Sequence, residues 1–329
     1  MVTQEQIARK LGVSRQLVTF ALAGYPQVSK ASRERILTAA RKLGYRPNPH
    51  ARALRRQRTG IIALWIPDQI STHYSQVARA LGRLLKQAGH ELIISEVGAA
   101  DANQLLSHVP VDGICAVDSS PAVQSHLESL KAKSIPVVSV GANASRKIDS
   151  VQVDLLSGTS EAMAHLIGAG FKRIAHATFV QEDDPQESRR KGYVTAMQDA
   201  GLKTEFIHYP LSEQQRPITR QLIRNYIGEH GRPEAIFCHS DDAALGIYRG
   251  LLDLGFRVPE DVALVGCDGI EDTEYLGCPL TTLVQPVPAM CVTAWQFLQQ
   301  RIDQPTVKIQ HSVLKPTLSL RESSRRADP

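Results

Sequence analysis

The sequence lacks the features of membrane and secreted proteins. No apolar run reaches the roughly 18 residues that a membrane-spanning helix needs, and the N-terminus MVTQEQIARKLG is polar, without the apolar core of a signal peptide. The five cysteines include no CxxC pair, and neither they nor the eleven histidines cluster at the short spacing of a metal site. We therefore expect a cytoplasmic chain with reduced core thiols and with no metal, cofactor or membrane partner.

Catalytic motifs are also missing. The sequence has no GxGxxG after a strand-like run, no GxxxxGK[ST] phosphate loop, no GxSxG elbow and no HExxH helix. Acidic pairs such as Asp183-Asp184 are adjacent in sequence, but no partner base or metal cluster accompanies them. These absences argue against an enzyme.

What the chain does have is length, an ordinary apolar content and an uneven charge. Its 329 residues suffice for two or three domains, and 43% hydrophobic with 22% charged residues is typical of globular proteins. Residues 1–59, here called the head, carry 13 Lys or Arg against two Glu, a net charge of +11. The remaining 270 residues carry 25 basic and 31 acidic side chains, a net charge of −6. The head therefore suggests contact with a polyanion, because neutralised phosphates release condensed counterions; a solvated basic surface is the alternative.

Local patterns predict three short helices in the head. Thr3 can cap a first helix that Gly12 ends, and Ser14 can cap a second helix over residues 15–22. A third helix is expected over about residues 32–43. Two helices joined by a three-residue turn that contains glycine match the helix-turn-helix, whose second helix enters the major groove of DNA. The predicted core of this unit comprises Ile7, Ala8, Leu11, Val13, Val18, Leu22, Ile36, Leu37 and Ala40.

Four motifs follow one another in the head. They are Thr3-x-x-x-Ile7-Ala8-x-x-Leu11-Gly12-Val13-Ser14, Val28-Ser29, Arg33-Glu34-Arg35-Ile36 and Leu43-Gly44-Tyr45-Arg46-Pro47-Asn48-Pro49. The ordered series resembles the N-terminal signature of the LacI/GalR family of bacterial transcription regulators. This resemblance implies sequence-specific binding to double-stranded DNA.

By that resemblance, Arg15 and Gln16 read bases at the start of the second helix. Arg can bind guanine O6 and N7 in a bidentate manner, and Gln can pair with adenine N6 and N7. Thr19 is expected to contact a phosphate. Phe20 replaces the family's common Arg, and it either touches a thymine methyl group or packs against the third helix. The predicted DNA-contacting residues of this unit are Thr3, Ser14, Arg15, Gln16, Thr19 and Phe20.

The segment after the helices, Asn-Pro-His-Ala-Arg-Ala-Leu-Arg-Arg over residues 48–56, resembles the family's hinge helix, which orders on DNA. Leu54 is the predicted wedge into the central minor-groove step, with Asn48, Ala51 and Arg55 beside it. An ordinary flexible basic linker is the alternative, and either interpretation places a domain boundary here. We expect a helix-turn-helix DNA-binding domain over residues 1–47, a hinge over 48–59 and a core over 60–329.

From residue 60 onward, strand-like runs alternate with helical stretches. Such alternation predicts parallel sheets with helices on both faces, and ligands of these sheets bind beyond the carboxyl ends of the strands. The predicted strands cover residues 61–66, 91–97, 113–117, 136–140, 173–178, 235–238 and 262–266.

Core motifs extend the family resemblance over essentially the whole chain. They include Val111-Asp112-Gly113-Ile114, Gly170-Phe171-Lys172-Arg173-Ile174-Ala175, Arg189-x-x-Gly192-Tyr193, Asp241-x-x-Ala244-x-Gly246 and Val265-Gly266-x-Asp268. The resemblance implies an α/β core of two doubly wound subdomains with parallel sheets, similar to periplasmic sugar-binding proteins, that clamp an effector between them. The N-subdomain is expected over about residues 60–156 and 286–315, and the C-subdomain over about 157–285 and the C-terminal segment.

By the same resemblance, Arg189, Ser240 and Asp268 contact the effector, with Asp241 next to Ser240. An Arg fork and Asp acceptors suit the hydroxyl groups of a sugar. Each residue also has a simpler interpretation: Asp241 could cap the following helix, Arg189 could pair with Glu187 on the surface, and Asp268 could end its strand. Ser240 stands where the family usually has Asn, and it cannot offer both an amide donor and a carbonyl acceptor.

The loop after the first core strand departs from the family's usual Asn-Pro-aromatic turn. It reads Asp68-Gln69-Ile70-Ser71-Thr72-His73-Tyr74. His73 and Tyr74 could stack on or hydrogen-bond an effector, and packing within the loop is the alternative.

The expected function is transcriptional regulation by a homodimer, as a repressor rather than an activator. Two heads would bind a near-palindromic operator, because the symmetry of the protein requires symmetry of the site. A small effector, most simply a sugar, would control operator affinity; a purine or a partner protein in that role, or a sugar-binding protein without a DNA role, are the alternatives. No leucine heptad follows Arg321-Glu322-Ser323, so dimers rather than tail-linked tetramers are expected.

Overall fold

The computed structural model describes residues 2–45, 58–67, 71–97, 109–118, 120–129, 135–142, 145, 147–179, 187–212 and 214–326. The chain divides into two compact units, Met1–Thr59 and Gly60–Pro329, and each is described by itself. The predicted hinge residues Asn48, Ala51, Leu54 and Arg55 lie outside the described residues.

The first unit contains three helices: α1 (Gln4–Leu11), α2 (Arg15–Leu22) and α3 (Lys30–Lys42). Each begins at a hydroxyl side chain that accepts a hydrogen bond from a backbone N–H of its first turn. Thr3 and Ser14 cap α1 and α2 as predicted. The third helix begins two residues earlier than predicted, because Ser29 is its cap and accepts from the N–H of Ser32.

The head has its own small apolar core. Helix α1 ends at Gly12, whose φ of +65° lies in the left-handed region that glycine adopts without strain. Among the predicted core residues, Leu11, Val13, Leu22 and Leu37 are only half-buried. The fully buried residues are Ile7, Ala8, Val18, Ala21, Val28, Ile36 and Ala40.

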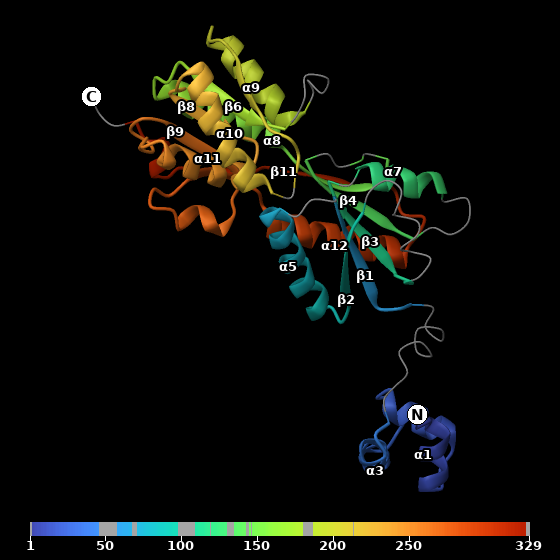
Figure 1. The fold of residues 1–329 in the computed structure, drawn as a ribbon. Coiled ribbons are helices and arrows are strands. Elements are labelled where there is room, and N and C mark those ends of the chain that lie inside the picture. The colour runs from blue at the N-terminus through green and yellow to red at the C-terminus, as the bar shows by residue number, and fades with distance from the viewer. Residues whose placement is uncertain are drawn as a thin grey trace. The chain divides into compact units, whose positions relative to one another are not determined.

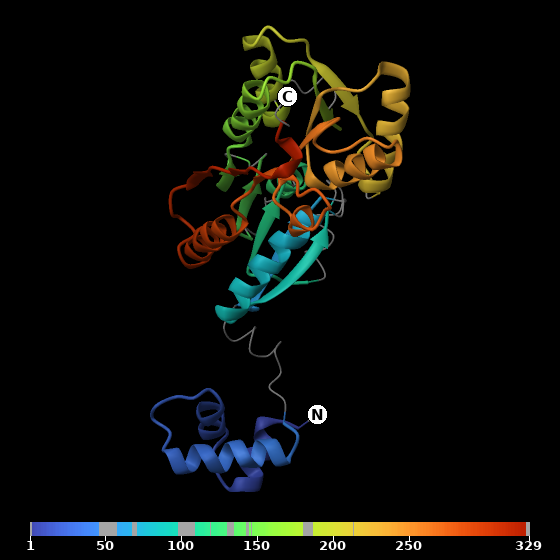
Figure 2. The same ribbon diagram turned by 90° about the vertical axis from the view of Figure 1, so that its left-hand side faces the viewer.

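The second unit contains two six-stranded sheets, which lie apart in Figure 1 and are seen from another side in Figure 2. The first sheet, in the order β11-β5-β4-β3-β1-β2, is parallel throughout. Its strands are β1 (Ile61–Ile66), β2 (Glu91–Glu96), β3 (Gly113–Val117), β4 (Val137–Gly141), β5 (Asp149–Val153) and β11 (His311–Leu314).

The second sheet has the order β12-β10-β9-β8-β6-β7. Its strands are β6 (Ile174–Thr178), β7 (Glu205–His208), β8 (Ala235–Cys238), β9 (Ala263–Asp268), β10 (Thr281–Val284) and β12 (Thr317–Ser319). The expectation of parallel strands holds except at the edge, where β12 pairs antiparallel with β10. This edge strand follows β11 of the first sheet after only two residues, so the chain crosses directly from one sheet to the other.

Helices cover both faces of each sheet, and a sheet with its helices is called a subdomain below. Along β1, Ile62, Leu64 and Ile66 join the apolar cluster that includes α5 and α12, whereas Ala63 and Trp65 join the cluster that includes α7. The helices are α5 (Thr72–Gln87), α7 (Ser120–Ser129), α8 (Leu155–Gly168), α9 (Ser188–Asp199), α10 (Gln215–His230), α11 (Asp241–Asp253) and α12 (Val287–Asp303), with 3-10 turns η1 (Glu271–Glu274) and η2 (Glu322–Ser324).

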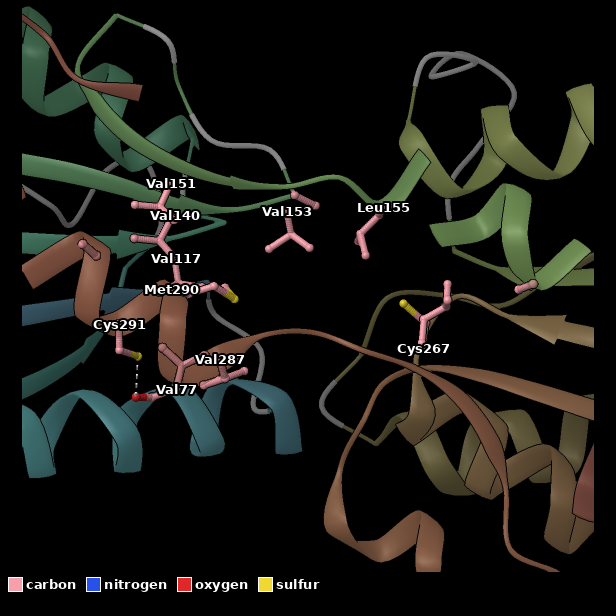
Figure 3. Packing of buried hydrophobic residues seen from close by; sticks show 14 of the residues in the cluster. Val77, Val117, Val140, Val151, Val153, Leu155, Cys267, Val287, Met290 and Cys291 are labelled. Carbon is pink, nitrogen blue, oxygen red and sulfur yellow. Dashed lines mark hydrogen bonds between the residues drawn. The ribbon is translucent and has the colours of Figure 1, made fainter. Parts of the chain in front are cut away.

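The chain passes between the two sheets three times, from β5 to α8, from β10 to α12 and from β11 to β12. One cluster of buried side chains continues through these passages, as Figure 3 shows for Val153, Leu155 and Val287. The same cluster contains Cys291 of α12, whose thiol donates to the carbonyl of Val77 on α5. No helix among the described residues is long and apolar enough to span a membrane.

Candidate DNA-binding surface and ligand site

Two side chains at the start of α2 are available to a partner. Arg15 and Gln16 are the first two residues of the helix, both are exposed, and the side chain of neither makes a hydrogen bond to another described residue. No acidic residue occupies this first turn, so the positive end of the helix dipole adds to the charge of Arg15. The geometry matches what reading of base edges from the start of a recognition helix requires.

The other predicted contacts of the head have roles within it. The hydroxyl of Thr19 lies 2.9 Å from Oε1 of Gln4 and 3.0 Å from the carbonyl of Arg15. Phe20 is half-buried against the head core, and its ring centroid lies 5.1 Å from that of Tyr25. The hydroxyls of Thr3 and Ser14 serve as helix caps, as described above. Contact of these four residues with DNA stays a prediction.

The predicted ligand residues of the core come from both subdomains and interact electrostatically. Burial raises the pKa of Tyr74, in the first turn of α5, and the carboxylates of Asp118 and Asp268 raise it further. The charge of Arg189 opposes this rise. Asp118 follows β3 in the first sheet, whereas Asp268 ends β9 in the second. The sequence therefore folds so that polar residues at the carboxyl ends of the two sheets face one another, as this fold class favours.

His73 is the most unusual side chain of the set. It is 3% exposed, and neither ring nitrogen has a hydrogen-bond partner among the residues that the structure describes. Burial lowers its pKa to about 4, with Asp118, Arg189 and Asp242 among the charges that act on it. A neutral imidazole can offer one donor and one acceptor, and a buried polar group without a partner costs free energy.

Arg189 pairs with Glu187, but the pair is buried rather than on the surface. Its Nε donates to Oε1 of Glu187 at 3.0 Å, and Nη1 donates to the carbonyl of His239 at 3.2 Å. Burial alone would raise the pKa of Glu187, yet Arg189 and the N–H groups at the start of α9 hold it at about 2. Burial also disfavours the charged form of Arg189, which lowers its pKa, but the negative charges of Glu187 and Asp268 raise the pKa by more. The guanidinium therefore stays charged.

Asp268 is held in a backbone conformation that side chains rarely adopt. Its φ is +131°, and such strain persists only where the surroundings impose it. The carboxylate of Asp241 supplies that constraint, accepting from the N–H of Gly269 at 2.7 Å and from that of Ile270 at 2.9 Å. A Cβ at Gly266 would lie 2.0 Å from Oδ1 of Asp241, so glycine is required there.

Both carboxylate oxygens of Asp241 therefore accept hydrogen bonds within the protein. Its Oδ1 also accepts from the hydroxyl of Thr282 at 2.7 Å, and its side chain is fully buried. Ser240, not Asp241, caps α11, since its hydroxyl accepts from the N–H of Ala243. Burial raises the pKa values of both Asp241 and Asp268, and Arg189 opposes the rise at Asp268.

Two residues near the site were not among the sequence predictions. Asp118 lies directly after β3, where the rule that polar residues after parallel strands line the site would have identified it. Gln285, on the passage from β10 to α12, donates from Nε2 to Oδ1 of Asp268 at 2.9 Å, and no sequence signal marks it. Within the described ranges, no group of three or more His, Cys, Asp and Glu side chains could hold a metal ion.

Comparison with known proteins identifies both units. Residues 3–48 match the bacterial regulatory proteins of the lacI family, and residues 163–324 match the periplasmic binding protein-like domain. The chain belongs to the LacI family. This family consists of DNA-binding regulators of transcription rather than enzymes, so the family and fold class predicted from the sequence are confirmed.

Relatives of this LacI-family regulator match it over nearly its whole length. The ribose operon repressor of Escherichia coli (strain K12) is 28% identical over 330 residues, 98% of this chain and 100% of that repressor. The solved complex of the transcriptional regulator CelR with cellobiose is 26% identical, covers 98% of this chain and 100% of its own, and has a TM-score of 0.68. The lac repressor dimer bound to operator and the anti-inducer ONPF shares the fold, with 23% identity, 99% coverage of both chains and a TM-score of 0.83.

Proposed function

We propose that this LacI-family protein is a cytoplasmic repressor that binds a near-palindromic operator as a homodimer and changes its operator affinity when a sugar binds in the core. The sugar would lie among His73, Tyr74, Arg189, Ser240 and Asp268. Asp241 would position the loop that carries Asp268 instead of contacting the ligand, because its oxygens already accept from Gly269, Ile270 and Thr282.

The observation that carries the ligand half of this proposal is the buried, unpartnered imidazole of His73. A sugar hydroxyl is both donor and acceptor, so it would satisfy a neutral imidazole and add charge-assisted hydrogen bonds to Arg189 and Asp268. The cellobiose complex of the related regulator supports a sugar as the ligand class.

The DNA half rests on the exposed Arg15 and Gln16 at the start of α2 and on the net charge of +11 over residues 1–59. A homodimer presents two such helices, which requires two symmetric half-sites. The hinge role of Asn48, Ala51, Leu54 and Arg55 is part of the proposal, with Leu54 as the minor-groove wedge. Operator DNA as the partner supports the cytoplasm as the compartment.

The first test is a thermal-shift screen of the full chain against monosaccharides, disaccharides, sugar phosphates and purines. A ligand at 100 times its dissociation constant stabilises a protein by about 2.7 kcal/mol, which is measurable. Asp268→Asn should abolish the response, whereas Asp261→Asn, at a carboxylate that pairs with Arg257 away from the site, should leave it intact.

The second test measures operator binding with and without the sugar that responds. Operator affinity should change in the wild type and stay constant in Asp268→Asn. A thermal response that survives Asp268→Asn would place the sugar elsewhere, and an operator affinity that saturating sugar leaves unchanged would contradict the allosteric part of the proposal.

A further inference from the structure

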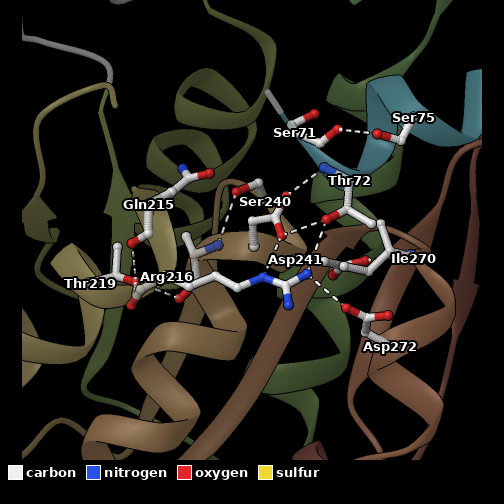
Figure 4. Close-up of polar contacts among 12 residues, drawn as sticks. Ser71, Thr72, Ser75, Gln215, Arg216, Thr219, Ser240, Asp241, Ile270 and Asp272 are labelled. Atoms are coloured by element: carbon white, nitrogen blue, oxygen red, sulfur yellow. Dashed lines mark hydrogen bonds and ion pairs between the residues drawn. The ribbon is translucent and has the colours of Figure 1, made fainter. Parts of the chain in front are cut away.

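The start of α5 is hydrogen-bonded to the opposite subdomain. The N–H of Thr72 donates to Oδ2 of Asp242 at 2.9 Å, and its hydroxyl donates to Oδ1 of the same carboxylate at 2.9 Å. The hydroxyl also accepts from Nη2 of Arg216 at 3.0 Å. Figure 4 shows Arg216 reaching toward Thr72 on one side and Asp272 on the other.

These contacts differ in their exposure to water. The side chain of Asp242 is 8% exposed and accepts from Thr72 and from Nε of Arg216 at 2.8 Å, so it is a buried carboxylate whose donors must stay in place. The ion pair of Arg216 with Asp272 is about half exposed on both sides, and such surface pairs contribute little. The connection between subdomains therefore depends on Thr72, Asp242 and Arg216.

The same two helix starts carry the candidate ligand residues. Thr72 directly precedes His73 in α5, and Asp242 directly follows Asp241, which holds the loop of Asp268. One turn farther along α5, Nε2 of Gln76 lies 3.5 Å from the carbonyl of Gly269 in that loop. Separation of Thr72 from Asp242 would move the imidazole of His73 away from the second subdomain.

We propose that Thr72, Asp242 and Arg216 form a latch between the subdomains, in which Asp242 and Arg216 are positioning residues that hold His73 in place beside the ligand. The latch does not need to touch the ligand. Because only the latched arrangement brings the ligand residues of both subdomains together, the apparent affinity for a ligand falls with the fraction of molecules that are latched. This consequence for ligand affinity rests on the proposed function, whereas the latch itself does not.

Two pairs of variants isolate the latch. Thr72→Val removes the bridging hydroxyl without changing size. Ser75→Ala is its control, since the Ser75 hydroxyl donates to the carbonyl of Ser71, the N-cap of the same helix. Arg216→Met removes the bridging guanidinium. Its control is Arg220→Met, one turn along α10, because Arg220 pairs with Asp253 of the same subdomain.

The deciding measurement is amide hydrogen exchange at residues 71–77 in the full chain without ligand. Thr72→Val removes two charge-assisted hydrogen bonds of the latch, with Asp242 and with Arg216, and Arg216→Met removes those of its guanidinium with Asp242 and Thr72. Either loss should accelerate exchange there about tenfold or more, with no acceleration in the two controls. Arg216 lies in the other subdomain, so an effect at the start of α5 reports the contact between subdomains and not a local defect of α10. Exchange in Arg216→Met that equals exchange in Arg220→Met would overturn the latch.

Calorimetric binding of D-ribose and cellobiose separates this inference from the proposed function. Weaker binding in both latch variants, with unchanged binding in both controls, supports the inference. If exchange accelerates while neither these two sugars nor any sugar of the thermal-shift screen binds the wild type, the latch stands and the proposed sugar ligand is contradicted. If a sugar binds through Asp268 but both latch variants bind it as the wild type does, the effect of the latch on ligand affinity is overturned and the proposed function stands.

Discussion

At the scale of single residues, the ligand site combines groups that are costly to bury. His73 has no hydrogen-bond partner within the described part of the chain, Arg189 is charged, and Asp268 is held at a φ of +131°. Strain and unsatisfied polar groups that survive in a folded core concentrate where a protein binds its ligands. A ligand that hydrogen-bonds the imidazole of His73 would relieve the cost of burying that group.

The cost of burying His73 predicts how stability depends on pH. Burial lowers the pKa of His73 to about 4 from its ordinary 6.5, so between these pH values the unfolded chain binds a proton that the folded chain does not. Its contribution to stability is complete above pH 6.5 and is lost as pH falls toward 4. From pH 7 to pH 5 the wild type should lose about 2 kcal/mol more than His73→Gln, which cannot titrate. Urea unfolding at both pH values measures this difference, and equal losses in the two proteins would contradict it.

Arg15 should determine base preference rather than overall affinity. Arg15→Ala should cost about 1–3 kcal/mol at one base pair of the operator and relax the preference there, because a bidentate contact with guanine is lost. Fluorescence anisotropy on an operator found by selection from random DNA, and on its single-base variants, measures the effect. Arg9→Ala is the matched control, since Arg9 is exposed on α1 and pairs with Glu5. A uniform loss on all sequences would show that Arg15 binds phosphate.

At the scale of elements, the contact between α10 and α11 requires glycine. A Cβ at Gly246 would lie 2.0 Å from Oγ1 of Thr219 and 2.3 Å from the carbonyl oxygen of Arg216. Gly246→Ala should therefore destabilise the core by about 3 kcal/mol, at the upper end of overpacking costs. A Cβ built at Gly228, within α10, would meet no described atom within 4 Å outside its own helical turn. Gly228→Ala should therefore stabilise the protein by about 0.5–1 kcal/mol. Denaturant unfolding of both variants gives the comparison, and equal effects would refute the steric argument.

The elements that sequence predicts well are those whose ends are encoded locally. Helix α2 begins at the predicted residue because the hydroxyl of Ser14 caps it, accepting from the N–H of Leu17 three residues on. The sequence pattern does not predict strands β5, β7, β10, β11 and β12. All five carry polar residues among their apolar ones, so pairing with a neighbouring strand and not their own pattern defines them.

The candidate site likewise has residues that the sequence predicts and contacts that only the folded structure reveals. The position of Asp268 after a buried strand is visible in sequence, and so is its chemistry. The hydrogen bonds of Thr72 with Asp242 join residues 170 positions apart, and no local pattern relates them. The engagement of Asp241 by the β9 loop is equally a product of folding, which is why sequence alone could not separate a ligand contact from a positioning residue.

At the scale of the whole molecule, charge is divided between the two units. Residues 1–59 carry a net charge of +11 and the rest of the chain carries −6. A polyanion is therefore attracted to the head and repelled by the core, which limits non-specific contact of the core with DNA. A neutral sugar feels neither effect, so the two binding activities should differ in their response to salt.

This difference gives a prediction within one protein. Operator affinity should fall by about 10³–10⁵ between 50 and 200 mM salt if the two heads of a dimer together make 6–10 phosphate contacts, because each neutralised phosphate releases condensed counterions. Sugar affinity should stay constant over the same range, since hydrogen bonds in a buried site are little screened. Anisotropy titrations with operator and calorimetry with sugar, both at four salt concentrations, provide the two slopes. An operator affinity that does not depend on salt would mean that the basic side chains of the head form a solvated surface and leave the phosphates untouched.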